Sequence, residues 1–302
     1  AMDDYELAMR GEGLRAMGIS TVSSVTGGML SGIALLLIAP PLARFSLRFS
    51  APEYFLLAIF GLTIIGSLAA DNLLKGLIAG VFGLALALIG YDVQFGIPRF
   101  TYGVAALESG LNNVAALIGL FSLSQVMIQA ENIKDLQIKK EIAELKGRFL
   151  PTIQESIHLI PFVIRASIVG IIIGILPGAG GDIGGWMGYN EAKRFSKHKE
   201  EFGHGSIEGI CGSESGNNAV TGGALIPLMT LGIPGSSAAA VLLGGLMIHG
   251  MAPGYDLFTK KAGITYAIII GFILANIFMG FVGALLAKQI AKIANVNYAI
   301  IA

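Results

Sequence analysis

Two proline–glycine segments interrupt stretches that are otherwise apolar enough for a lipid bilayer. They are residues 174–182, GILPGAGGD, and residues 231–237, LGIPGSS. Proline lacks an amide donor and clashes with the preceding helical turn, and glycine adds backbone freedom, so we expect a hydrophobic helix to stop and restart at each segment. Interrupted backbone at membrane depth occurs only where it is buried in protein or lines a wet cavity. Two such breaks therefore indicate a binding site for a small polar solute, as in secondary transporters.

The composition favours a membrane protein over a soluble one. Hydrophobic residues make up 54% of the chain and charged residues only 13%, against roughly 25% charged in soluble domains. The 20 basic and 20 acidic side chains cancel, so nucleic acid is not expected as a partner. Cys211 is the only cysteine, which excludes an internal disulfide and a cysteine-rich metal site. Residues 1–4, AMDD, are not expected to begin a signal peptide.

Apolar runs of about 20 residues predict the membrane helices. The first run, residues 17–38, is expected to end at Pro40-Pro41; the others are residues 54–70, 76–90, 104–127, 157–176, 206–251 and 264–287. Basic residues gather in the polar loops 130–156 and 190–204, which the positive-inside rule places in the cytoplasm. The segment 157–189 must then enter the membrane and return, with Pro177-Gly178 at its tip.

A sparse internal repeat appears at an offset of roughly 250 residues, where Tyr5-Glu6-Leu7 faces Tyr255-Asp256-Leu257. With the helix breaks, it predicts an all-α polytopic membrane protein with internal, inverted repeats and with broken helices or re-entrant hairpins at the Pro-Gly motifs. Residues 1–150 are interpreted as the end of a first repeat with scaffold helices and a cytoplasmic loop. Residues 151–302 form the second-repeat transport region of the same membrane domain. A related half-repeat is expected upstream of Ala1.

A helix that restarts after a break has first-turn amides without intrahelical partners, and its dipole places partial positive charge there. A substrate carboxylate therefore fits at the restart after Pro234, whereas at the first restart the carboxylate of Asp182 would compete with it. Ser236 has a second interpretation, as the N-cap of its own helix, and the two roles are compatible because one cap leaves other amides free.

Glu214, Asn217 and Asn218 come just before an apolar run, where polar groups are costly and commonly functional. Asparagine offers both an acceptor and donors, so the pair suits a cation and a carboxylate together. The alternative is that they only hold helices together by hydrogen bonds. The predicted substrate-binding residues are Pro177, Gly178, Ala179, Gly180, Asn217, Asn218, Pro234, Gly235, Ser236 and Ser237.

Two carboxylates are candidates for the coupling cation, Na⁺ or H⁺. Asp182 follows the first break and either caps a helix over residues 183–189 or binds the cation through its oxygens. Glu214 is the second candidate. No catalytic residue, resident metal or cofactor is predicted.

The chain resembles the large permease subunit of the tripartite tricarboxylate transporters over nearly its whole length. The motifs that carry the resemblance occur in family order: Pro52-Glu53-Tyr54-Phe55, Gly90-Tyr91-Asp92, Arg99-Phe100-Thr101-Tyr102-Gly103, Ile118-Gly119-Leu120-Phe121, Pro177-Gly178-Ala179-Gly180, Tyr189-Asn190-Glu191-Ala192-Lys193-Arg194, Glu201-Phe202-Gly203-His204-Gly205, Glu208-Gly209, Glu214-Ser215 with Asn217-Asn218-Ala219, Leu231-Gly232-Ile233-Pro234-Gly235 and His249-Gly250.

The resemblance implies a sodium- or proton-driven importer of tricarboxylates or dicarboxylates in a bacterial inner membrane, with several spans. It implies a small membrane subunit and a periplasmic solute-binding protein as partners. The sequence departs from the family pattern at Asp182, Ser213, Gly216 and Tyr255. These positions lie in or beside the predicted site, so they bear on substrate identity more than on the fold.

Other classes of protein have less support. The chain contains neither the Gly-x-Ser-x-Gly nor the His-Glu-x-x-His motif, which argues against an intramembrane enzyme. The glycines of the first break are followed by Asp182 and not by the lysine of a phosphate-binding loop, which argues against an ATP-driven pump. A passive anion channel stays open as an alternative to a cation-coupled importer, and dependence of uptake on an ion gradient separates the two.

Overall fold

The computed structural model describes residues 2–50, 52, 53, 55, 56, 59, 73–92, 97–111, 127, 148–176 and 180–293. These residues are mostly helical. The helices are α1 (Met2–Leu7), the π-helix η1 (Ala8–Glu12), α2 (Gly13–Ser46), α4 (Leu73–Ala87), α5 (Ala105–Glu108), α8 (Ile153–Ile175), α9 (Gly180–Phe195), the 3₁₀-helix η4 (Lys199–Glu201), α10 (Ile207–Leu231), α11 (Ser237–Ile248), α12 (Tyr255–Thr259) and α13 (Ala262–Ile293). A two-stranded antiparallel hairpin, β1 (Gly90–Tyr91) and β2 (Pro98–Arg99), pairs Gly90 with Arg99.

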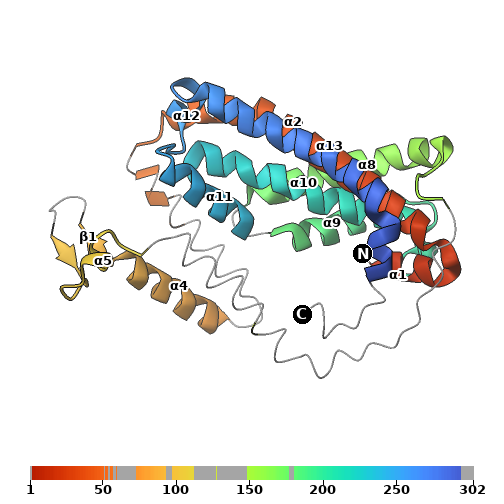
Figure 1. The fold of residues 1–302 in the computed structure, drawn as a ribbon, viewed down its shortest axis with the longest axis horizontal. Coiled ribbons are helices and arrows are strands. Elements are labelled where there is room, and N and C mark those ends of the chain that lie inside the picture. The colour runs from red at the N-terminus through yellow and green to blue at the C-terminus, as the bar shows by residue number, and fades with distance from the viewer. Residues whose placement is uncertain are drawn as a thin grey trace.

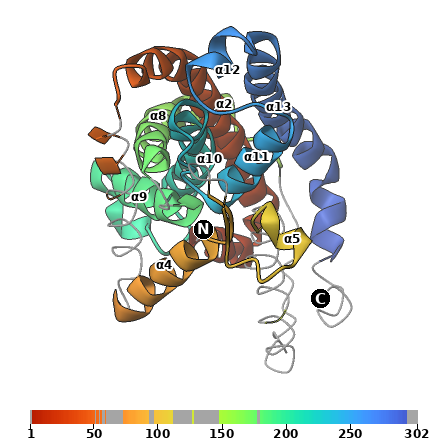
Figure 2. The ribbon, with the colours of Figure 1, turned by 90° about the vertical axis from the view of Figure 1, so that its left-hand side faces the viewer.

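The helices form a bundle with α10 at its centre. Helices α2, α8 and α9 all pack against α10, and α13 lies along α2 (Figure 1). The view along the bundle shows the neighbours of α10 arranged around it (Figure 2). Among the described residues, the helices in Asp3–Ser46, Ile153–Ile175 and Ala262–Ala287 are long and apolar enough to cross a membrane. The predicted multi-helix membrane fold is thus confirmed in its helical character.

The close contacts of glycine fix the direction of each helix. Along α10, Ser215 meets Gly27 and Gly222 meets Ser31, so α2 runs parallel to α10. Helix α8 is also parallel to α10, because Gly170 meets Gly216 and Gly174 meets Val220. Helix α9 is antiparallel to α10, because Gly184 meets Val220 whereas Gly188 meets Gly212. The start of α8 and the end of α9 therefore lie at the same end of the bundle, as a hairpin requires. The membrane side of that end stays a prediction.

Glycine is required along α10 because the backbones of its neighbours lie where a side chain would project. A β-carbon built on Gly216 would lie 2.5 Å from the carbonyl oxygen of Gly184 and 3.1 Å from Cα of Gly188. One on Gly223 would lie 2.5 Å from the carbonyl oxygen of Ile171. Small residues permit such close approach, and it is a main source of helix association in membranes, where burial of apolar surface supplies little.

A buried carboxylate joins the beginning of the described chain to the beginning of α10. Asp3 of α1 is fully buried, and its Oδ1 accepts hydrogen bonds from the backbone N–H groups of Gly203 (2.8 Å), Gly205 (2.7 Å) and Ser206 (3.0 Å). Ser206 is itself the N-cap of α10, because its hydroxyl accepts from the N–H of Gly209 at 3.1 Å. The loop before α10 is thus held by an acidic residue about 200 positions away.

The expected end of the first span at Pro40-Pro41 is wrong, because α2 continues through both prolines to Ser46. Each proline removes one intrahelical hydrogen bond, at a cost of about 3 kcal/mol in a helix interior. Ala39 and Ala43, on either side of the pair, are fully buried in the same apolar cluster as Leu225 and Leu228 of α10. Packing against α10 therefore outweighs the local preference to stop.

Two other predicted spans have different outcomes. The span 104–127 does not begin as one long helix: α5 ends at Glu108, and Gly110 adopts a left-handed φ of 79°. Most of that span, and residues 54–70 apart from 55, 56 and 59, lie outside the described residues. The remaining spans correspond to α4, α8, α10 with α11, and α13. The internal repeat remains a prediction.

The glycine contacts predict a specific loss of stability. Gly216→Ala should lower the free energy of unfolding by about 1–3 kcal/mol, because the added methyl group overlaps backbone of α9 that cannot move alone. Gly271→Ala is the matched control, since a β-carbon there meets nothing within 4 Å among the described atoms. Thermal unfolding of both variants in detergent tests this, and equal melting temperatures would contradict the packing described.

Candidate functional site

The two helix breaks meet at the carboxyl-terminal end of α8. Helix α8 ends at Ile175, just before the first break, and α10 ends at Leu231, just before the second. A β-carbon built on Gly235 would overlap the carbonyl oxygen of Gly174 and lie 2.9 Å from Cα of Ala224. The second break is therefore packed directly on the last turn of α8, so segments about 60 residues apart form one region of the bundle.

Asn217 of α10 lies against the restart of the helix after the first break. Helix α9 begins at Gly180, and a β-carbon built on Gly181 would lie 3.2 Å from Oδ1 of Asn217. One turn further along α9, Gly185 approaches Cβ of Asn217 in the same way, at 3.5 Å. The amide of Asn217 is thus placed beside the first-turn N–H groups of α9, which lack intrahelical acceptors.

A narrow polar face runs along α10, and we call it the polar strip. Its members are partly or fully exposed, whereas most other residues of this helix are buried: Ser213, Glu214, Asn217, Asn218 and Thr221. The buried faces carry the glycines that contact α2, α8 and α9. The polar strip therefore lies between α2 and α9, on the part of α10 that its neighbours cover only in part.

Glu214 and Asn218 do not point to the breaks as Asn217 does. The hydroxyl of Ser24 in α2 donates to Oε2 of Glu214 at 3.0 Å. Nδ2 of Asn218 donates to the carbonyl oxygen of Glu214 at 3.2 Å, within the same helix. Of the three polar residues predicted here, the structure brings one to the first break and turns Glu214 towards α2. The alternative that Asn218 links two helices is not supported by this hydrogen bond.

Ser236 is the N-cap of α11, as one of its two interpretations required. Its hydroxyl accepts from the N–H of Ala239 at 3.2 Å. One cap satisfies one of the first-turn amides of a helix, so a second acceptor at this end is still compatible with the geometry. Pro234 and Gly235 precede the cap, and the side chain of Ser237 is not described.

The first break is described only at its edges. Pro177, Gly178 and Ala179 lie outside the described residues, as does the side chain of Asp182. The expectation that Asp182 caps a helix over residues 183–189 is wrong, because α9 already begins at Gly180, where φ is +68°. Glycine tolerates this left-handed conformation, so the helix starts earlier than a search for an acidic cap suggests.

One partly buried ionisable pair escaped the sequence analysis. Oε1 of Glu208, in the first turn of α10, lies 2.7 Å from Nε2 of His158 in α8. Glu208 is the buried member at 4% exposed, whereas the side chain of His158 is 53% exposed. The pair joins the starts of two parallel helices. In the sequence, the only sign of this pair was that Glu208 stands three positions before Cys211, the single cysteine. Nothing in the sequence placed His158 beside Glu208.

A bundle with apolar helices of membrane-spanning length, in which two helix breaks converge beside a polar strip, is the arrangement of an α-helical membrane transport protein. The chain belongs to the tripartite tricarboxylate transporter TctA family, whose family model matches residues 1–302. The family is one of transporters, so the chain is not an enzyme. The resemblance stated from the sequence motifs is thereby confirmed.

Two proteins of Agrobacterium vitis are similar to this chain. The "Uncharacterized 52.8 kDa protein in TAR-I ttuC' 3'region" is 35% identical over 281 residues, which cover 92% of this chain and 55% of the relative. The "Uncharacterized protein in TAR-II ttuC' 3'region" is 38% identical over 110 residues, which cover 36% of this chain and 46% of the relative. The chain thus spans about half the length of the curated relatives it matches. No solved structure matches it.

The contact between the two breaks predicts a transport defect. Gly235→Ala should reduce uptake to near background, because its methyl group forces the second break away from the end of α8. Gly245→Ala in α11 is the control, since a β-carbon there meets nothing within 4 Å among the described atoms. Uptake is measured at equal amounts of folded protein in the membrane. Normal transport by Gly235→Ala would remove the second break from the site.

Proposed function

We propose that the chain is part of the large membrane subunit of a secondary active, cation-coupled importer of small carboxylates. In this proposal it works in a bacterial inner membrane with a small membrane subunit and a periplasmic solute-binding protein. Family membership supports the transport of tricarboxylates. The coupling ion, the dicarboxylate or tricarboxylate preference and the partners are the proposed additions.

The observation that carries the proposal is the convergence of both breaks and Asn217 on one region. Two helices, α9 and α11, restart there, and each first turn presents N–H groups with partial positive charge. A small anion fits such a place, because amides and dipole act on it together. A substrate with two or three carboxylates is able to use both restarts at once, which favours it over a monocarboxylate.

Asn217 and Glu214 have separate roles in this proposal. Beside the restart of α9, the amide nitrogen of Asn217 donates to a substrate carboxylate, and its oxygen accepts from a substrate hydroxyl or coordinates a cation. Glu214, hydrogen-bonded to Ser24, offers carboxylate oxygen to the cation on the side of α2. Cation binding between α2 and α10 would then bias the packing of α10, and with it the position of Asn217.

Uptake by the reconstituted transporter tests the proposal. The full-length permease is placed in liposomes with its partner subunits, and accumulation of labelled citrate and succinate is followed under a sodium gradient, a proton gradient or neither. We expect accumulation against the substrate gradient with one of the two ions. Equilibration without any ion gradient would instead indicate a passive channel, and absence of uptake of both acids would exclude this substrate class.

Asn217→Ala should raise the half-saturation constant for substrate by about tenfold, since one hydrogen bond to a charged group contributes about 1.5–3 kcal/mol. Asn276→Ala is the matched control. Asn276 of α13 is buried, and its Nδ2 donates to the carbonyl oxygen of Phe272 at 2.8 Å, away from both breaks. This control should lower thermal stability and leave the half-saturation constant unchanged. An unchanged constant in Asn217→Ala would place the substrate elsewhere.

A further inference from the structure

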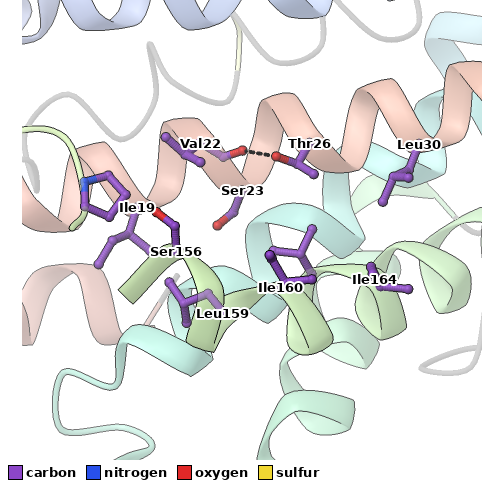
Figure 3. Close-up of a pocket in the computed structure, with 11 residues that line it drawn as sticks. Ile19, Val22, Ser23, Thr26, Leu30, Ser156, Leu159, Ile160 and Ile164 are labelled. Atoms are coloured by element: carbon purple, nitrogen blue, oxygen red, sulfur yellow. Dashed lines mark hydrogen bonds between the residues drawn. The ribbon is translucent and has the colours of Figure 1, made fainter. Parts of the chain in front are cut away.

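An apolar groove of about 350 Å³ runs between α2 and α8. One wall contains Ile19, Val22 and Leu30 of α2, and the other contains Leu159, Ile160 and Ile164 of α8 (Figure 3). Ile160 is 51% exposed, so the groove opens on the surface of the bundle. Both walls belong to helices long and apolar enough to cross a membrane. Among the residues that the structure describes, none of those predicted to take part in transport lines the groove.

The hydroxyl groups that line the groove already have hydrogen-bond partners within the protein. Thr26 donates to the carbonyl oxygen of Val22 at 2.7 Å, as Figure 3 shows. Ser156 donates to the carbonyl oxygen of Thr152 at 2.9 Å. Ser23 is buried and paired with the thiol of Cys211. A polar solute would therefore gain few hydrogen bonds here, and the chemistry of the walls selects an apolar occupant.

The width of the groove distinguishes between two possible occupants, a lipid acyl chain and a protein helix. The α2 wall extends from Ile19 to Leu30, which is about 17 Å at about 1.5 Å per residue. A volume of about 350 Å³ spread over this length makes a narrow groove, whereas an α-helix with its side chains is about 10–12 Å wide. A single methylene chain is therefore able to lie inside the groove, whereas a protein helix would rest across its mouth.

Basic side chains lie at one end of the groove. Arg15 is one turn before Ile19 and forms ion pairs with Glu12 and Glu155. Arg148 is 63% exposed at its side chain and lies 3.9 Å from Oε2 of Glu155. That oxygen already accepts from the N–H of Thr152 at 2.7 Å and from its hydroxyl at 2.9 Å. Arg148 is thus only loosely held by Glu155 and is able to pair with a phosphate.

We infer that the groove binds one acyl chain of an anionic phospholipid, with the lipid phosphate paired to Arg148. Arg148 supplies attraction to the headgroup, and the apolar walls supply contact with the chain. A lipid bound there contacts α2 and α8 together and supports the packing of the α8–α9 hairpin on the bundle. This binding requires no transport activity, so its test is independent of the proposed function.

Lipid retention by the purified full-length permease tests the inference. The protein is incubated in mild detergent with phosphatidylglycerol or phosphatidylcholine, and bound lipid is counted by native mass spectrometry. We expect about fivefold greater retention of phosphatidylglycerol, the factor that corresponds to about 1 kcal/mol from one basic side chain near the headgroup. Arg148→Gln should abolish this preference, so that retention of phosphatidylglycerol falls to about that of phosphatidylcholine.

Filling the groove should reduce retention of both lipids. Ile160→Trp blocks it from the α8 side, and Thr26→Phe blocks it from the α2 side if the first variant folds poorly. Ile168→Trp is the matched control, because Ile168 is on the same helix, equally exposed at 51%, and outside the groove. Undiminished retention in a folded filling variant would overturn the inference. So would a photoreactive residue at position 160 that crosslinks to polypeptide instead of lipid.

Discussion

The backbone-to-backbone approach of α10 to its neighbours is the contact on which the rest of the structure depends. Gly216 meets Gly184 and Gly188 of α9 at distances that exclude a side chain. The same helix contacts α2 and α8 through other glycines, so one element fixes the spacing of three others. Because α9 is drawn this close, its first turn reaches the amide of Asn217. The geometry of the candidate site therefore depends on glycine at these contacts, because a side chain there would force the helices apart.

Much of the fold was predictable from the pattern of apolar residues along the sequence. Apolar runs located α8 and α13 because their length and hydropathy reflect the bilayer directly. The failure at Pro40-Pro41 has a different origin: local preference predicted a stop, but burial of Ala39 and Ala43 against α10 decided the outcome. The prediction of one long helix from residue 104 failed for a similar reason: the helix ends at Glu108, and hydropathy does not detect the left-handed turn at Gly110. Tertiary contacts and turn conformation are not properties of a hydropathy average.

The candidate site was predictable in its position and less so in its orientation. Proline and glycine indicated where α8 and α10 end, because their effects on helices are local. The direction of each polar side chain on α10 was not predictable, because even positions three apart on a helix differ in direction by about 60°, and the sequence does not say which neighbour lies on either side. Glu214 thus faces Ser24, while Asn217 faces Gly181. The pairing of Glu208 with His158 and of Asp3 with the loop before α10 joins positions far apart in sequence, which pattern analysis does not connect.

The burial of Asp3 has a consequence for the order of assembly. Its three amide donors lie in residues 203–206, so they are synthesised about 200 positions later, which is roughly 10–40 s at about 5–20 residues per second. Until then the carboxylate has no such partners, and dehydrating it would be costly. It therefore stays in contact with water until then. Docking of α1 through Asp3 consequently follows synthesis of the loop before α10, although α1 itself is made much earlier.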